Sequence, residues 1–124
     1  MNIKDISVIT LIMLIIDYIY LKLIAGKPFL KMVKKIQKKE SKVKYMSALF
    51  VYMLLVVAMY NYVIYNPSYY NAFMLGSIIY GVFDFTNYAL FKNYDLMIGI
   101  QDTIWGGLLF TSSKYMFELS KNYI

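Results

Sequence analysis

The chain has 124 residues, of which 60% are apolar, and its net charge is +6. This length provides one domain, residues 1–124, and a mean hydropathy of +0.54 favours a membrane protein over a soluble domain, which keeps a large polar surface. Cysteine and histidine are absent, so disulfides, thiol-dependent cofactors and the usual haem and zinc ligands are not expected.

The first predicted element is the apolar segment 6–25, in which Asp17 lies near the middle. Its length is close to the roughly 20 residues that a helix needs to cross a bilayer. A cleaved signal peptide is the alternative reading. Asp17 and the lack of a convincing small-residue cleavage site argue against it, so we expect the segment to stay in the mature protein.

The connection 26–45 is rich in lysine and has a helical pattern, with Pro28 suited to a first helical position and Phe29 and Met32 near one face. We expect a helical segment that lies at the membrane interface, where each lysine near anionic headgroups contributes about 1 kcal/mol. The lysines assigned to this surface are Lys31, Lys34, Lys35, Lys38 and Lys39. A solvated loop that only sets topology is the alternative. Nucleic acid is not an expected partner, because the loop has no arginine and few aromatic residues for base stacking.

Three further apolar segments follow, at 46–65, 69–91 and 96–117. The predicted fold is therefore all-α, an integral membrane bundle of four transmembrane helices. The lysines of 26–45, together with Lys92 in the third connection, assign both connections to the cytoplasmic side and both termini to the opposite side. The sequence leaves open whether the bundle forms a homo-oligomer.

Three of the seven acidic residues, Asp17, Asp84 and Asp102, fall inside predicted spans one, three and four. At a rise of about 1.5 Å per residue, each lies about 9 to 12 Å from the lysine-rich face, so the three can form one cluster. An intramembrane carboxylate costs at least about 2.5 kcal/mol and normally faces the bundle interior. No lysine lies at that depth. The acids are therefore protonated, joined by a hard cation or a cationic ligand, or reached by water, and no metal ligand is assigned.

Other polar residues near these aspartates complete the candidate site: Thr86, Asn87, Gln101 and Trp105. Asn87 is three residues from Asp84, and Trp105 is three residues from Asp102, so each pair shares a helix face. Trp105 is also compatible with simple core packing. Glycines on spans three and four predict close helix packing there: Gly76, Gly81, Gly99, Gly106 and Gly107.

Three short motifs carry a family resemblance: D-x-x-Y at Asp17 to Tyr20, DFTNYA at Asp84 to Ala89, and DTIWG at Asp102 to Gly106. Together they resemble the small four-span membrane proteins catalogued as domain of unknown function 2177, over essentially the whole chain. Phe83 and Phe85 stand where that family usually has tyrosine and leucine. The resemblance implies an inner-membrane-type protein and strengthens the candidate site, but it implies no activity.

Three functions stay open at this point. The aspartate cluster binds or handles a proton, a cation or an amphiphilic ligand near the inner leaflet. Alternatively, protonated acids only join the helices of a structural or assembly protein. The third option is an enzyme that acts on a lipid through carboxylate or metal chemistry.

Overall fold

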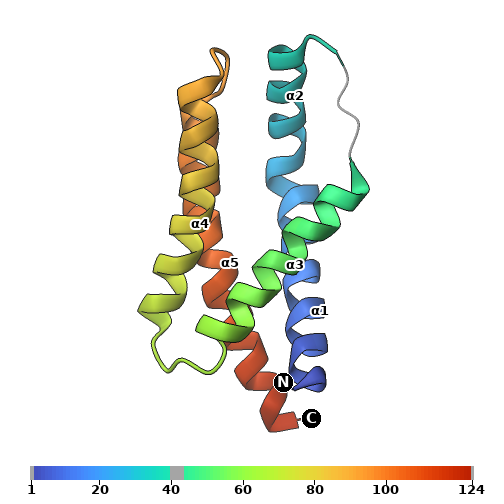
Figure 1. Cartoon of the computed structure of the whole chain (residues 1–124), viewed down its shortest axis with the longest axis vertical. Coiled ribbons are helices and arrows are strands. Elements are labelled where there is room, and N and C mark those ends of the chain that lie inside the picture. The colour runs from blue at the N-terminus through green and yellow to red at the C-terminus, as the bar shows by residue number, and fades with distance from the viewer. Residues whose placement is uncertain (1, 40–43, 124) are drawn as a thin grey trace.

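The structure, a computed structural model, describes residues 2–39 and 44–123 and is all-helical, as predicted (Figure 1). Residues 40–43 of the lysine-rich connection lie outside the described residues. The elements are α1 (Ile3–Tyr20), η1 (Leu21–Ala25), α2 (Gly26–Gln37), α3 (Tyr45–Tyr62), α4 (Tyr69–Leu90) and α5 (Leu96–Tyr123).

The first three elements form one continuous helix of 35 residues. It begins at Ile3, after the N-cap residue Asn2, whose side chain accepts a hydrogen bond from the backbone N–H of Asp5 at 3.1 Å. A π-helical turn, η1, carries the chain from α1 into α2, and a Cβ at Gly26 would lie only 2.5 Å from the carbonyl oxygen of Leu21. The helix ends at Lys38, which has a left-handed φ of 59°. The lysine-rich segment is thus helical, but it extends the first helix instead of following a break.

One face of α2 packs against the connection between α4 and α5. Met32 and Tyr94 are both buried, and the backbone N–H of Asp95 donates to Met32 Sδ at 3.1 Å. In Figure 1, α2 and this connection lie at one end of the molecule and both termini at the other. The lysines assigned to the membrane surface are exposed. Their contact with headgroups, and the cytoplasmic location of this end, stay predictions.

Helices α4 and α5 form an antiparallel hairpin with very close backbones. A Cβ at Gly76 would lie 2.1 Å from the carbonyl oxygen of Gly106, and one at Gly107 would lie 2.4 Å from Ser77 Oγ. Packing at these positions requires glycine. Gly81 is less tight, with Thr103 Cγ2 at 3.3 Å, and Gly99 has only ordinary contacts at 3.7 Å.

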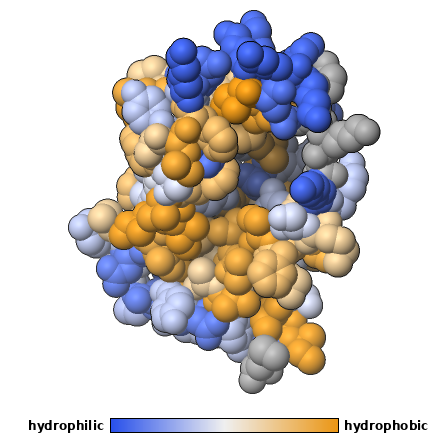
Figure 2. Space-filling view, turned by 45° about the horizontal axis from the view of Figure 1, so that its top comes forward, coloured by the Kyte–Doolittle hydropathy of each residue, from blue (hydrophilic) through white to orange (hydrophobic). Residues whose placement is uncertain are grey.

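The core lies toward the termini, where Ile9 and Met13 of α1 meet Met59 of α3 and Phe110 of α5, all fully or almost fully buried. The outer faces remain apolar, and Figure 2 shows a broad hydrophobic band below the hydrophilic end of the molecule. An exposed apolar surface of this extent is typical of a membrane or protein contact. The 35-residue helix and α3 are long and apolar enough to cross a membrane. Crossing by α4 and α5 stays a prediction.

Charged and polar side chains anchor α5 at the end that carries both termini. Lys114, which is 1% exposed, donates to Glu118 at 2.7 Å and lies 5.0 Å from the centre of the Tyr69 ring, while the Tyr69 hydroxyl also donates to Glu118. The hydrogen bond from Lys114 lowers the pKa of Glu118, and the bond from Tyr69 acts in the same direction. Beside this pair, Lys121 lies 3.3 Å from Asp5. Helix α5, which contains the predicted fourth span 96–117, continues to Tyr123 because side chains anchor its last turns.

Candidate functional site

Asp17 joins three helices. Its carboxylate accepts a hydrogen bond from the Tyr52 hydroxyl of α3 and another from Trp105 Nε1 of α5, the latter at 3.1 Å. The side chain is only 6% exposed, so these donors replace the water that a buried carboxylate loses. The Trp105 ring also stacks on Tyr20, with ring centres 3.9 Å apart. This fixes the orientation of the donor.

Asp84 is fully buried on α4, beside the start of α5. Its Oδ1 accepts a hydrogen bond from the Tyr94 hydroxyl at 2.6 Å, and its Cβ lies 3.7 Å from the position that a Cβ on Gly99 would occupy. Its second oxygen, Oδ2, is buried and has no hydrogen bond that meets normal geometry within the described residues. Leaving such a group unsatisfied costs about 1 to 3 kcal/mol, so this oxygen requires an explanation.

Asp102 is half-buried on α5 and is the neighbour of Asp84. Asp84 packs against Gly99, one helical turn before Asp102, so the two aspartates are neighbours. Within the described residues, Asp102 accepts no hydrogen bond from a tyrosine or tryptophan, in contrast to Asp17 and Asp84. It is therefore the aspartate with the most unused hydrogen-bonding capacity.

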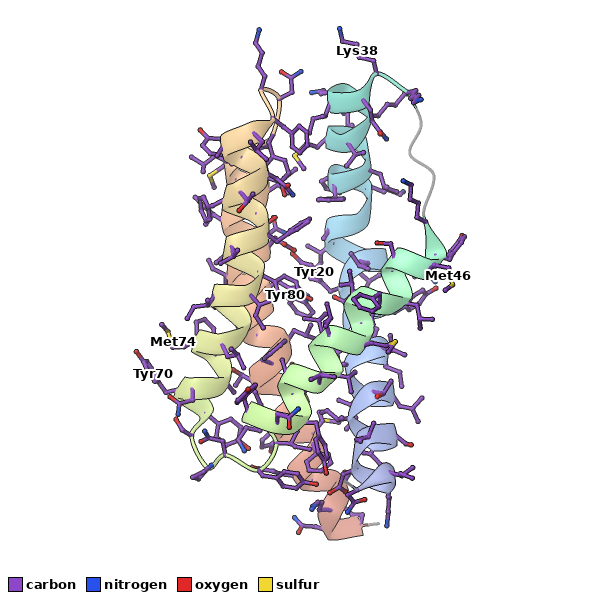
Figure 3. The ribbon with its side chains drawn as sticks, viewed as in Figure 1. Tyr20, Lys38, Met46, Tyr70, Met74 and Tyr80 are labelled. Atoms are coloured by element: carbon purple, nitrogen blue, oxygen red, sulfur yellow. The ribbon has the colours of Figure 1, made fainter. Side chains whose placement is uncertain are left out.

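A pocket of about 440 Å³ lies where α1, α3, α4 and α5 meet the start of α2. Asp17, Gln101 and Asp102 reach it, and Tyr20 and Tyr80, which also line it, lie near mid-height of the molecule in Figure 3. Gln101 Nε2 donates to the Tyr20 hydroxyl at 3.2 Å. The remaining lining is mostly apolar, and no lysine among the described residues contributes to it. The pocket is therefore mostly apolar, and the charged side chains that line it are acids.

The sequence matches the DUF2177 model, described as a predicted membrane protein, over residues 2–117. The chain belongs to the DUF2177 family. A search of the curated proteins and a search of the solved structures found no match. The matched range contains Asp17, Asp84, Asp102 and every residue that lines the pocket. Membership identifies this DUF2177 chain as a predicted membrane protein and assigns no reaction.

In this DUF2177 protein, two of the polar residues have partners other than those that the sequence suggested. Trp105 donates to Asp17 and not to Asp102, and Asn87 interacts with Tyr94 instead of directly with Asp84. Thr86 is exposed on α4. Shared helix faces predict neighbours on one helix, whereas the side chains found here bond across helices.

The option of one cation held by all three aspartates has no support in this geometry. In the described part of the chain, which includes all three, no group of three or more acidic side chains is arranged to hold a metal ion. Asp17 is bonded to Tyr52 and Trp105, while Asp84 and Asp102 form a separate pair. Asp17 and Asp102 line one pocket, and Asp84 packs against Gly99 one turn before Asp102, but the rise per residue could not supply these lateral positions.

The sequence did not indicate which tyrosines donate hydrogen bonds to the acids. Four do so, each to a different carboxylate: Tyr52, Tyr94, Tyr65 and Tyr69. A tyrosine in an apolar segment is a usable signal, because its hydroxyl needs a partner when buried. With 14 tyrosines in the chain, the signal does not select which ones reach an acid.

Proposed function

We propose that this DUF2177 protein crosses the membrane four times and binds an amphiphilic molecule from the bilayer in the pocket at Asp102. The pocket carries the proposal. Its volume of about 440 Å³ falls within the range of about 300 to 1,000 Å³ common for small-molecule sites, and such sites combine apolar walls with a few convergent polar groups.

The chemistry of the lining argues for a head group that donates hydrogen bonds or carries positive charge. The ionisable side chains at the pocket are acids and tyrosines, and no described lysine lines it. An anionic head would meet Asp17 and Asp102 without a compensating cation. Since Asp17 is already bonded to Tyr52 and Trp105, Asp102 and Gln101 are the groups that we assign to the head.

The walls are suited to the apolar part of the same ligand. Leu55 of α3, Ile79 of α4 and Ile98 of α5 line the chamber, and Ala25 and Phe29 close it from the long first helix. With the lysine-rich end in the cytoplasm, the pocket would lie in the inner half of the bilayer. The exposed lysines of α2 would then face anionic headgroups.

A structural role is the second candidate, and Asp17 favours it. One carboxylate that bonds to both α3 and α5 holds three helices together. This role and ligand binding are compatible, because they use different aspartates.

Binding can be tested with the single tryptophan, Trp105, as a fluorescent reporter close to the site. The protein in lipid nanodiscs is titrated with decylammonium and, separately, with decanol. We expect a saturable change for decylammonium that weakens at least tenfold in Asp102→Asn and is lost in Ala25→Phe, which fills the pocket. Asp95→Asn is the matched control, since Asp95 is an exposed acid outside the pocket. Equal responses in all four proteins would refute the proposal.

A further inference from the structure

Asp84 and Asp102 stand out as neighbouring acids on the two helices of the α4–α5 hairpin, because Asp84 packs against Gly99, one helical turn before Asp102. Asp84 is fully buried, and its Oδ1 already accepts the Tyr94 hydroxyl. Its Oδ2 has no hydrogen-bond partner among the described residues, and the neighbouring ionisable group on α5 is Asp102. Two negative oxygens would repel each other here, whereas a proton between them would give the buried oxygen a partner.

The groups that surround this pair supply no counter-charge. From α1, the pair is faced by Asp17 and by Tyr20, and Tyr80 and Tyr94 face it from α4 and from the α4–α5 connection. Among the described residues none of the groups acting on Asp102 is a lysine. Asp17 adds negative charge, so full ionisation of the pair is further disfavoured.

We infer that Asp84 and Asp102 share one proton in the empty protein, and that a cationic head group bound at Asp102 displaces this proton. The inference rests on the proposed function and adds an exchange step to it. When the ligand's ammonium group reaches Asp102, the O–H bond within the pair breaks and the proton passes to water in the pocket. The positive charge of the ligand replaces that of the proton, so the local charge balances.

The first test measures protons released when decylammonium binds. Its ammonium group, with a pKa near the lysine value of about 10.4, remains charged around neutral pH. Calorimetry in buffers of different ionisation enthalpy should give close to one proton released per ligand. Affinity should also rise about tenfold per pH unit over the range in which the empty pair holds its proton. Decanol, which is neutral, should release none.

Variants distinguish proton exchange from simple attraction. Asp84→Asn keeps the size and hydrogen-bonding capacity of the side chain but leaves Asp102 without an acidic neighbour. We expect it to bind decylammonium with little proton release and a flatter pH dependence, while Asp95→Asn behaves as wild type. Binding by the wild-type protein with no proton release and with an affinity that stays constant between about pH 5 and 8 would overturn the inference.

The shared proton can be detected without ligand by the infrared carbonyl band of a protonated carboxyl group. We expect the band at neutral pH in wild type and in Asp17→Asn, its loss in both Asp84→Asn and Asp102→Asn, and its loss on addition of decylammonium to wild type. Absence of the band in the empty wild-type protein overturns the inference even if decylammonium binds. A band that persists while no probe binds removes the proposed function, and the exchange step with it. These two failures are therefore distinguishable.

Discussion

The indole N–H of Trp105 donates to the carboxylate of Asp17 at 3.1 Å, so the single tryptophan of the chain connects α5 to α1. The same ring stacks on Tyr20, which lies on α1 three residues after Asp17. Asp17 and Tyr20 both line the pocket, so the contacts of Trp105 join helix packing to the wall of the site.

Replacing Trp105 with phenylalanine should destabilise the protein by about 1 to 3 kcal/mol, because the buried Asp17 loses a charge-assisted hydrogen bond that the new ring cannot supply. The measurement is reversible unfolding in mixed micelles, followed by circular dichroism. Tyr115→Phe, a change at an exposed ring on the same helix, is the control and should have almost no effect. Equal stability of Trp105→Phe and wild type would show that the bond contributes nothing.

The close contact in the α4–α5 hairpin predicts a strong difference between two glycine substitutions. Gly106→Ala would place a methyl group 2.5 Å from both the carbonyl oxygen of Gly76 and the ring of Tyr80, and we expect overpacking to cost about 1 to 3 kcal/mol or more. Gly99→Ala, with contacts of 3.7 Å, should be much milder. Thermal unfolding of the two variants side by side makes the comparison, and a reversed order would be inconsistent with this packing.

Stability should fall at acidic pH through Glu118. The hydrogen bond from Lys114 lowers the pKa of Glu118 in the folded protein below its usual value of 4.5. A depressed carboxyl pKa contributes stability that is complete above the unfolded value and is lost as the pH falls through the folded value. The melting temperature of wild type should therefore decline below about pH 4.5 more steeply than that of Glu118→Gln. Parallel curves for the two proteins would argue against a role for this ion pair.

Packing of Met32 on the α4–α5 connection predicts local protection of α2. Met32→Ser should increase amide hydrogen exchange in α2 and around Tyr94, because a buried apolar side chain and a hydrogen bond from the Asp95 N–H are lost together. Exchange in α1 should change little. Leu30→Ser, at a side chain that is 52% exposed, serves as the control. If both variants exchange alike, α2 does not depend on this contact.

The helices could be predicted from the sequence because the length and hydropathy of apolar segments directly determine them. The third segment, predicted at 69–91, ends within one residue of α4. The π turn at Leu21–Ala25 could not be foreseen, since Gly26 and Pro28 normally mark an interruption and only the local geometry carries the helix through.

The sequence predicted the three aspartates as one group, but it did not predict which side chains bond to each of them. Asp17, Asp84 and Asp102 lie at similar depth because rise per residue is fixed, but which hydroxyl or indole meets each acid depends on how the helices rotate about their axes. That rotation follows from packing at Gly76 and Gly106 and from stacking of Tyr20 on Trp105. Periodicity within one helix contains no information about it.

The uninterrupted helix from Ile3 to Gln37 has a geometric consequence. At about 1.5 Å per residue its 35 residues extend over roughly 50 Å, well beyond the roughly 30 Å of a bilayer's hydrocarbon. If the predicted span 6–25 occupies the hydrocarbon, the helix leaves it near Ala25, and the pocket-lining residues Leu21 and Phe29 lie on either side of that boundary. A ligand that lies along this part of the helix would thus have one end in hydrocarbon and the other in water within about two helical turns.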